Sequence, residues 1–128
     1  MTKDIEALAD RFFDAISRGD VATLADIYSA EVAVWHNYDD VEQTREESLR
    51  LLGRLHRKAG PMRYEQVRRT VLDDGFVQQH VVELAGVAQG LRMPAMLRVR
   101  CDGRHIHRIE EYVDPGPLNA RLAGPSAP

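Results

Sequence analysis

The feature that most constrains the fold is an Asp-Gly dipeptide between two runs of alternating residues near the end of the chain. Asp102-Gly103 follows the run 97–101 and precedes the run 105–114. Because a type I′ turn needs positive φ at both central residues, this arrangement predicts a β-hairpin. Alternation places every second residue of the returning strand on one face, namely His105, His107, Ile109, Glu111 and Val113. Two imidazoles and a carboxylate among aliphatic side chains are typical of a ligand cavity, and not of a purely structural core.

Length and composition limit the possible classes of protein. The chain has 128 residues, of which 44% are hydrophobic, which suits one domain with its own core. The formal net charge of −3 argues against a binder of nucleic acid or anionic membrane, which would need a basic surface. No apolar run approaches the roughly 18 residues of a membrane span, and we expect no export signal. Cys101 is the only cysteine, which favours a reducing, cytoplasmic location.

Three helices are predicted in the first half of the chain. Apolar residues at helical spacing mark the first helix, which should end at Gly19: Ile5, Leu8, Ala9, Phe12, Phe13 and Ile16. Asp20 is expected to cap a short second helix. Asp40 and Gln43 resemble a capping box, which predicts that a third helix begins there. This third helix should end at Gly60-Pro61.

Strands occupy most of the second half. The run 32–36 is rich in β-forming residues and predicts a strand between the second and third helices. Three longer runs, 62–72, 76–85 and 91–101, precede the Asp-Gly turn and predict a β-meander. Pro94 within the last of these runs indicates a bulge or a sheet edge.

Helices followed by mostly antiparallel strands predict an α+β fold. We expect a cone-shaped, curved mixed or antiparallel β-sheet wrapped around three N-terminal helices. Residues 1–114 should form this single domain. Residues 115–128, rich in proline and glycine, should form a C-terminal tail with a short helical turn around 118–122. The convex side of such a sheet must be covered, so we also expect a homodimer.

Three runs of this chain resemble the nuclear transport factor 2-like superfamily and, within it, the SnoaL-like group. They extend from Arg11 to Asp20, from Leu24 to Val32, and from Ile106 to Asp114, which ends in Glu-Tyr-x-Asp. Together they span nearly the whole domain. The resemblance implies the cone-shaped fold, but that fold hosts isomerases, cyclases, hydrolases, dehydratases and pure binding modules.

Ketosteroid isomerases of this superfamily carry an oxyanion-hole tyrosine on the first helix, a position that falls here on Phe12. Their general-base aspartate at the end of the first strand falls on His36, and their protonated aspartate falls near Leu97. Two hydrogen-bond donors are therefore missing, and an oxyanion hole without donors cannot stabilise an enolate. The resemblance argues against this activity unless other donors replace them.

Limonene-epoxide hydrolases use an Asp-Arg-Asp set with a tyrosine and an asparagine. The last aspartate falls on Glu111, and the Arg-x-Asp pair falls near Val81 and Glu83, so the arginine is missing. The asparagine falls on His36, or on Asn37 with a shift of one residue. The chain thus has carboxylates at positions of this pattern but lacks the arginine that accompanies them.

SnoaL-like cyclases use a pocket acid as general acid and base for a ring-closing aldol step, and the groups available here are His36, Glu111 and His107. An imidazole can take or give a proton near neutral pH. His107 shares the predicted face of Glu111, so the two are expected to pair. The structural alternatives are a bond from His36 to the turn at Asp39 and an exposed Glu111 at the rim.

Six further residues are expected to contact a ligand: Phe12, Val34, Asn37, Glu83, Leu97 and Ile109. His80 and Glu83 lie on opposite faces of one strand, so at most one of them enters the cavity. We expect no metal and no cofactor, since no short-spaced ligand motif is present.

The sequence therefore predicts a small cofactor-independent protein that acts by general acid/base catalysis in a pocket. Its substrate would be a hydrophobic metabolite of polyketide, terpenoid or steroid type, and its reaction an isomerisation, cyclisation or hydrolysis. The alternative is a non-catalytic ligand-binding or dimerisation module of the same fold. A dimerisation module would have its interior filled by its own side chains. Neither nucleic acid nor membrane is expected as a partner.

Overall fold

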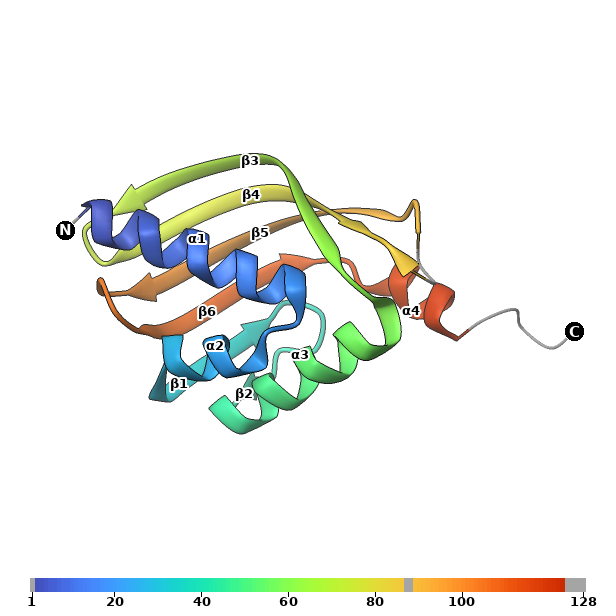
Figure 1. Ribbon diagram of the computed structural model, residues 1–128, viewed down its shortest axis with the longest axis horizontal. Coiled ribbons are helices and arrows are strands. Elements are labelled where there is room, and N and C mark those ends of the chain that lie inside the picture. The colour runs from blue at the N-terminus through green and yellow to red at the C-terminus, as the bar shows by residue number, and fades with distance from the viewer. Residues whose placement is uncertain (1, 87–88, 124–128) are drawn as a thin grey trace, which may run out of the picture.

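The computed structural model describes residues 2–86 and 89–123, which form four helices around one six-stranded sheet. The helices are α1 (Thr2–Arg18), α2 (Val21–Ile27), α3 (Arg45–Ala59) and α4 (Gly116–Leu122). The strands are β1 (Tyr28–His36), β2 (Glu42–Gln43), β3 (Met62–Leu72), β4 (Gly75–Leu84), β5 (Arg92–Cys101) and β6 (Ile106–Val113). The sheet curves over α1, while α2 and α3 lie along its β1 side and α4 lies at the opposite end from the N-terminus (Figure 1).

The strand order is β2-β1-β6-β5-β4-β3, and the sheet is mixed. Every neighbouring pair is antiparallel except β1 and β6, which run parallel. The first and last strands of this order do not pair, so the sheet curves without closing into a barrel. The predicted α+β fold, with a curved mixed sheet around N-terminal helices, is confirmed. No helix in the described part of the chain is long and apolar enough to span a membrane.

The main core lies between α1 and the inner face of the sheet. Phe12 of α1 and Phe76 of β4 are completely enclosed. Phe13 packs edge-on against Phe12 and against Tyr64 of β3, with 5.0 Å between ring centroids in each case. Burying one such side chain stabilises the fold by about 1.5–3 kcal/mol, so this aromatic cluster holds α1 on the sheet.

A second apolar cluster lies at the α4 end of the sheet. Its buried members are Ala59, Met62, Val82, Leu84, Met93 and Leu118. Leu118 belongs to α4, within the segment 115–128 that was expected to form a tail. Part of that segment is therefore packed against the sheet.

Two of the predicted helix boundaries are confirmed by their caps. The Asp20 carboxylate accepts a hydrogen bond from the Thr23 N–H at 3.1 Å and begins α2. Gly60 ends α3 with φ of 81°, a conformation that glycine adopts at little cost.

The predicted start of α3 is wrong, because the capping box lies further along the chain. The Thr44 hydroxyl accepts from the Glu47 N–H at 3.3 Å, and the Glu47 carboxylate accepts from the Thr44 N–H at 2.9 Å. Gln43 instead belongs to β2. Asp40 has φ of 55° and accepts a hydrogen bond from the Trp35 indole at 2.7 Å. Both spacings satisfy the sequence rule, and pairing of β2 with β1 excludes the earlier one.

A β-bulge interrupts β6 close to its start. Arg100 of β5 pairs with Arg108, whereas the next residue, Cys101, pairs with Ile106. Two steps along β6 therefore face one step along β5, and the extra residue is His107. Such a bulge reverses the inward and outward alternation of the strand on one side of it.

Removing the capping hydroxyl in Thr44→Ala should lower the free energy of unfolding by about 1 kcal/mol, because the first turn of α3 loses a partner for a backbone N–H. Urea denaturation followed by circular dichroism measures this change. Thr44→Ser keeps the hydroxyl and should stay within a few tenths of a kcal/mol of the parent protein. Equal loss in both variants would contradict the cap.

Candidate active site

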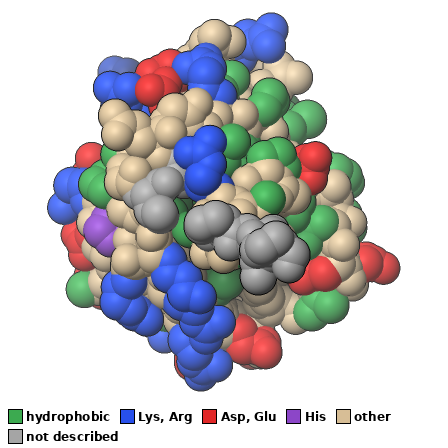
Figure 2. Space-filling view, turned by 90° about the vertical axis from the view of Figure 1, so that its right-hand side faces the viewer, with side chains coloured by type: hydrophobic (Ala, Val, Ile, Leu, Met, Phe, Trp, Pro, Cys, Tyr) green, Lys and Arg blue, Asp and Glu red, His purple; other side chains and the backbone are tan. Residues whose placement is uncertain are grey.

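A cavity of about 210 Å³ lies between the inner face of the sheet and helices α1, α3 and α4. An apolar cavity of about 150 Å³ is already large enough for benzene. Every described helix and strand except α2 contributes to its wall, which is mostly aliphatic and aromatic. Figure 2 looks onto the α4 end of the molecule, where hydrophobic side chains lie beside lysine and arginine side chains. The cavity leaves part of the interior unfilled by the side chains of the chain itself. A dimerisation module was expected to have a filled interior instead.

His36 and Glu111 meet in this cavity. His36 is the last residue of β1, and Glu111 is its direct partner in the parallel strand β6. The imidazole Nε2 lies 3.1 Å from the carboxylate Oε1. The side chains are 11% and 24% exposed, respectively, so the pair is largely shielded from water and the carboxylate is its more accessible half. The sequence-based expectation that these two groups share one hollow agrees with this geometry.

The pairing with Glu111 also assigns the proton on His36. A carboxylate accepts hydrogen bonds, so in the neutral imidazole Nε2 carries the hydrogen and Nδ1 carries a lone pair. Nδ1 is buried and has no hydrogen-bond partner among the described residues.

Three tyrosines lie within range of the charge of Glu111. Burial raises the pKa of Tyr28 to about 12, and the charge of Glu111 adds to this effect. Burial and then the charge of Glu111 also raise the pKa values of Tyr38 and Tyr64. The Tyr28 hydroxyl is hydrogen-bonded to the Ser48 hydroxyl at 3.0 Å. All three phenols therefore stay neutral near pH 7.

The prediction that His107 shares the cavity with Glu111 is wrong. His107 is the extra residue of the bulge, so its side chain turns outward, while Ile106 and Ile109 on either side are both buried. Its Nε2 lies 3.1 Å from the Asp102 carboxylate, on the surface. A simple alternation rule assumes an unbroken strand and could not detect this inversion.

Of the six residues expected to contact a ligand, four lie in the cavity wall: Phe12, Val34, Leu97 and Ile109. Asn37 does not line it. The Asn37 side-chain carbonyl accepts a hydrogen bond from the Val113 N–H at 2.9 Å, and its own N–H donates to the Glu111 carbonyl at 3.1 Å. Asn37 therefore fixes the end of β6 beside β1, and its assignment as a ligand contact is wrong.

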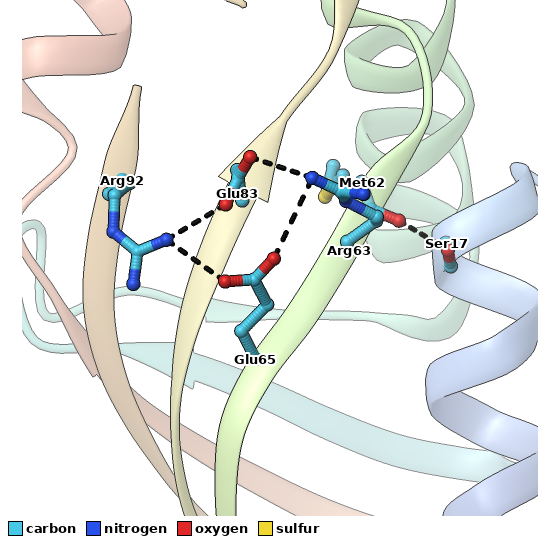
Figure 3. A network of polar contacts seen from close by, with 6 residues as sticks. All are labelled: Ser17, Met62, Arg63, Glu65, Glu83 and Arg92. Carbon is cyan, nitrogen blue, oxygen red and sulfur yellow. Dashed lines mark hydrogen bonds and ion pairs between the residues drawn. The ribbon is translucent and has the colours of Figure 1, made fainter. Parts of the chain in front are cut away.

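Glu83 does not line the cavity either, and it belongs to a ring of charges on the outer face of the sheet (Figure 3). Arg63 contacts Glu83 at 2.7 Å and Glu65 at 3.6 Å, and Arg92 contacts Glu65 at 2.9 Å and Glu83 at 2.8 Å. The ring ties β3, β4 and β5 together from outside. These ion pairs account for the carboxylate of Glu83 without a ligand. The prediction that Glu83 contacts a ligand is therefore wrong. Figure 3 also shows Ser17 of α1 donating to the Met62 carbonyl on the edge of β3.

Sequence analysis gave no role to the buried polar residues of β4. Phe76, Gln78, His80 and Val82 all face inward, and Gln78 and His80 lie 2.9 Å apart through Nε2 and Nδ1. The sequence could have indicated their burial, because Gln78 and His80 alternate with Phe76 and Val82 on the face of the strand that is otherwise apolar. Within residues 2–86 and 89–123, no three His, Cys, Asp or Glu side chains are placed to hold a metal ion.

Comparison with known proteins identifies the family. The profile of the SnoaL-like domain matches residues 9–111, so the chain belongs to the SnoaL-like domain family. The resemblance to the nuclear transport factor 2-like superfamily and its SnoaL-like group is thereby confirmed. No curated protein sequence matches the chain.

Solved structures share this fold at low sequence identity. A proposed SnoaL-like polyketide cyclase from Shewanella putrefaciens CN-32 superposes with a TM-score of 0.80 at 17% identity, over 96% of this chain and 87% of that one. AclR, a proposed hydroxylase from Streptomyces galilaeus, gives 0.78 at 14% identity, over 98% and 100%. IdmH, a proposed polyketide cyclase from Streptomyces antibioticus, gives 0.76 at 13% identity, over 93% and 98%.

Acidification should destabilise the protein in part through His80. Burial lowers the pKa of this imidazole to about 4 in the folded chain, against about 6.5 in the unfolded chain. Below pH 6.5 the unfolded chain binds a proton that the folded chain excludes. The free energy of unfolding therefore falls as the pH drops from about 6.5 to about 4, and His80 adds no further loss below that. We expect about 1–2 kcal/mol from this group between pH 7 and pH 5, measured by urea denaturation.

The control is a comparison of two histidine variants at the same two pH values. His80→Phe should lose this component of the pH dependence, whereas His107→Gln should retain it. A pH dependence unchanged in His80→Phe would show that His80 is not the buried neutral group.

Proposed function

We propose that this chain is a cofactor-independent enzyme that moves protons on a hydrophobic small molecule, with His36 and Glu111 as its acid–base pair. The observation that carries the proposal is the 3.1 Å contact between the two groups inside a mostly apolar cavity. A purely structural ion pair is unfavourable there, because removing two polar groups from water costs free energy. Apolar side chains of similar size would fill the same space without that cost. Membership of the SnoaL-like family is consistent with this function.

The pair acts as one unit. The Glu111 carboxylate, its more exposed half, meets an acidic C–H of the ligand and accepts the proton. His36 orients this carboxylate, because its Nε2 lies 3.1 Å from Oε1. The same proton is then returned to another carbon or to an oxygen of the ligand. Such positioned acid–base groups contribute about 10²–10⁴-fold to a rate.

The wall indicates the class of substrate. It consists mostly of leucine, methionine, valine and aromatic side chains, and it also contains the hydroxyls of tyrosines and of Ser48. We therefore propose a largely hydrophobic metabolite with a few oxygen functions, of the polyketide, terpenoid or steroid type. Isomerisation and aldol ring closure both need one group that removes a proton and returns it.

The test uses 5-nitrobenzisoxazole, a small aromatic probe of proton abstraction. A base removes its C–H proton while the ring N–O bond breaks, which gives a coloured nitrophenolate. We expect His36→Gln and Glu111→Gln each to lower kcat/KM by about 10²-fold. The double variant should lose no more than either single variant, because groups that act as a unit are not additive.

His107→Gln is the matched control, because it breaks a second His–carboxylate contact of the same 3.1 Å length that lies on the surface. It should leave the elimination rate unchanged. Unchanged rates in both His36→Gln and Glu111→Gln would refute the acid–base pair. Binding of the probe by the parent protein without any elimination would support the non-catalytic ligand-binding module instead.

We also propose that the outer face of the sheet is covered by a second copy of the chain. Met96 and Tyr112 lie opposite each other on β5 and β6, and both are exposed there. The Trp35 ring lies 5.4 Å from the Tyr112 ring, which extends the apolar area onto β1. Exposed apolar groups gathered in this way are typical of an interface.

Sedimentation equilibrium at micromolar concentration should show a dimer, and Met96→Glu should shift it toward monomer, because a charge would be buried at the interface. Val41→Glu, at an exposed hydrophobic residue just before β2, is the control and should leave the dimer intact. A parent protein that is monomeric under these conditions would rule the dimer out.

A further inference from the structure

One tyrosine hydroxyl in the cavity wall has no partner within the protein. Tyr64 lies on β3 opposite the buried Val82 of β4, on the face of the sheet that points inward. Its ring packs edge-on against Phe13 of α1, with 5.0 Å between ring centroids, and against His80 of β4, at 4.7 Å. The hydroxyl at the tip of this ring makes no hydrogen bond to any residue in the described part of the chain.

The space that this hydroxyl can reach is the cavity. Tyr64 lines the cavity and is only partly buried, although it lies between α1 and the sheet. Three other polar side-chain atoms without a partner in the described residues are fully enclosed, with essentially no accessible surface: His36 Nδ1, Gln43 Oε1 and His80 Nε2. The Tyr64 oxygen is not enclosed in this way. Because the ring faces inward, an atom that contacts this oxygen must lie inside the cavity.

The charges near Tyr64 indicate what kind of group it can bind. Burial raises the pKa of Tyr64, and the charge of Glu111 raises it further. The phenol therefore keeps its hydrogen near pH 7 and can donate it. A negatively charged ligand group beside this hydroxyl would be repelled by Glu111, whereas an uncharged oxygen would not. The surroundings thus favour a neutral hydrogen-bond acceptor.

The hydroxyl has no structural purpose that a phenylalanine would not serve equally well. A phenyl ring at position 64 would make the same edge-on contacts with Phe13 and His80. Removing a hydroxyl from bulk water without giving it a hydrogen bond costs free energy, and native structures seldom keep such a group without a reason. A ligand oxygen in the cavity would supply the missing partner.

We propose that the Tyr64 O–H donates a hydrogen bond to an uncharged oxygen of the ligand in the cavity, namely a ketone, ester or quinone carbonyl. Tyr64 is then a residue that determines specificity, on a different strand from the acid–base pair. This inference rests on the proposed function only for the presence of a ligand in the cavity. It narrows the class of that ligand to apolar molecules that carry a carbonyl group.

The first experiment reads the hydrogen bond from the carbonyl stretching band of bound acetophenone, by infrared difference spectroscopy with a carbon-13 label on the carbonyl. A hydrogen bond weakens the C=O bond, so the band should lie at lower wavenumber in the parent protein than in Tyr64→Phe. Tyr112→Phe removes the hydroxyl of an exposed tyrosine on the outer face and should give the parent spectrum. The same band position in the parent protein and in Tyr64→Phe would overturn the inference.

The second experiment compares the dissociation constants of acetophenone and cumene, which has the same shape without the oxygen, by calorimetry. The parent protein should prefer acetophenone over cumene about tenfold more strongly than Tyr64→Phe does, as expected for one hydrogen bond to a shielded donor. Tyr112→Phe should keep the preference of the parent protein. An unchanged preference in Tyr64→Phe, or no binding of acetophenone to the parent protein, would also overturn the inference.

A third experiment distinguishes this role from a structural one. Tyr64→Phe should unfold at the same urea concentration as the parent protein or at a higher one, because no hydrogen bond within the protein is lost. Tyr28→Phe should unfold at a lower concentration, because it removes the 3.0 Å hydrogen bond to Ser48. Equal destabilisation by the two substitutions would show that the Tyr64 hydroxyl has a structural partner, against the inference.

The two proposals fail independently. The Tyr64 experiments read binding, a vibration and stability and need no turnover, so they remain valid if the elimination assay shows no role for His36 and Glu111. Conversely, an unchanged carbonyl band in Tyr64→Phe would leave the elimination rates, and hence the acid–base pair, untouched.

Discussion

The site depends on one parallel strand pairing in a sheet that is otherwise antiparallel. Because β1 and β6 run in the same direction, the end of β1 brings His36 directly beside Glu111. A slip of one residue would turn one of these side chains to the outer face and separate the pair. Asn37 prevents that slip, since its N–H and its side-chain carbonyl both bond to the backbone of β6. A residue that looked like a ligand contact thus acts by fixing the register that creates the site.

The sequence was sufficient for features that depend on local chemistry. The helix that ends at Gly60 and the meander follow from spacing and turn preferences, and the family resemblance supplied the overall architecture. The hairpin between β5 and β6 also forms, but neither Asp102 nor Gly103 has a positive φ, so the predicted type I′ turn is wrong. The wrong predictions concern residues whose orientation depends on pairing with another strand. The bulge at His107 exists because of how β6 pairs with β5, and alternation within β6 alone cannot show it. Likewise, Glu83 and His80 occupy opposite faces of β4, and only the outer ion pairs with Arg63 and Arg92 explain why the acidic one is outside.

Among the described residues that line the mostly apolar cavity, Glu111 is the one carboxylate. On one side, the carboxylate of Glu111 is accompanied by His36 and by tyrosines that burial keeps neutral. A second buried polar pair, Gln78 and His80, lies on β4 outside the residues that line the cavity. Apolar residues such as Leu97 lie between them in the sheet. A mostly apolar cavity with its carboxylate on one side favours one orientation of an asymmetric occupant over its reverse, because the wrong orientation leaves this polar group unsatisfied.

The short helix α4 has a consequence for how such a protein can diversify. It is seven residues long, and Leu118 is its deepest contribution to the chamber. The two groups of the proposed acid–base pair, by contrast, belong to strands β1 and β6. Substitutions or insertions in the final segment can therefore deepen or shorten the chamber while the chemistry stays in place. Evolution can therefore change the size of the molecule that fits by altering α4, without changing either residue of the proposed pair.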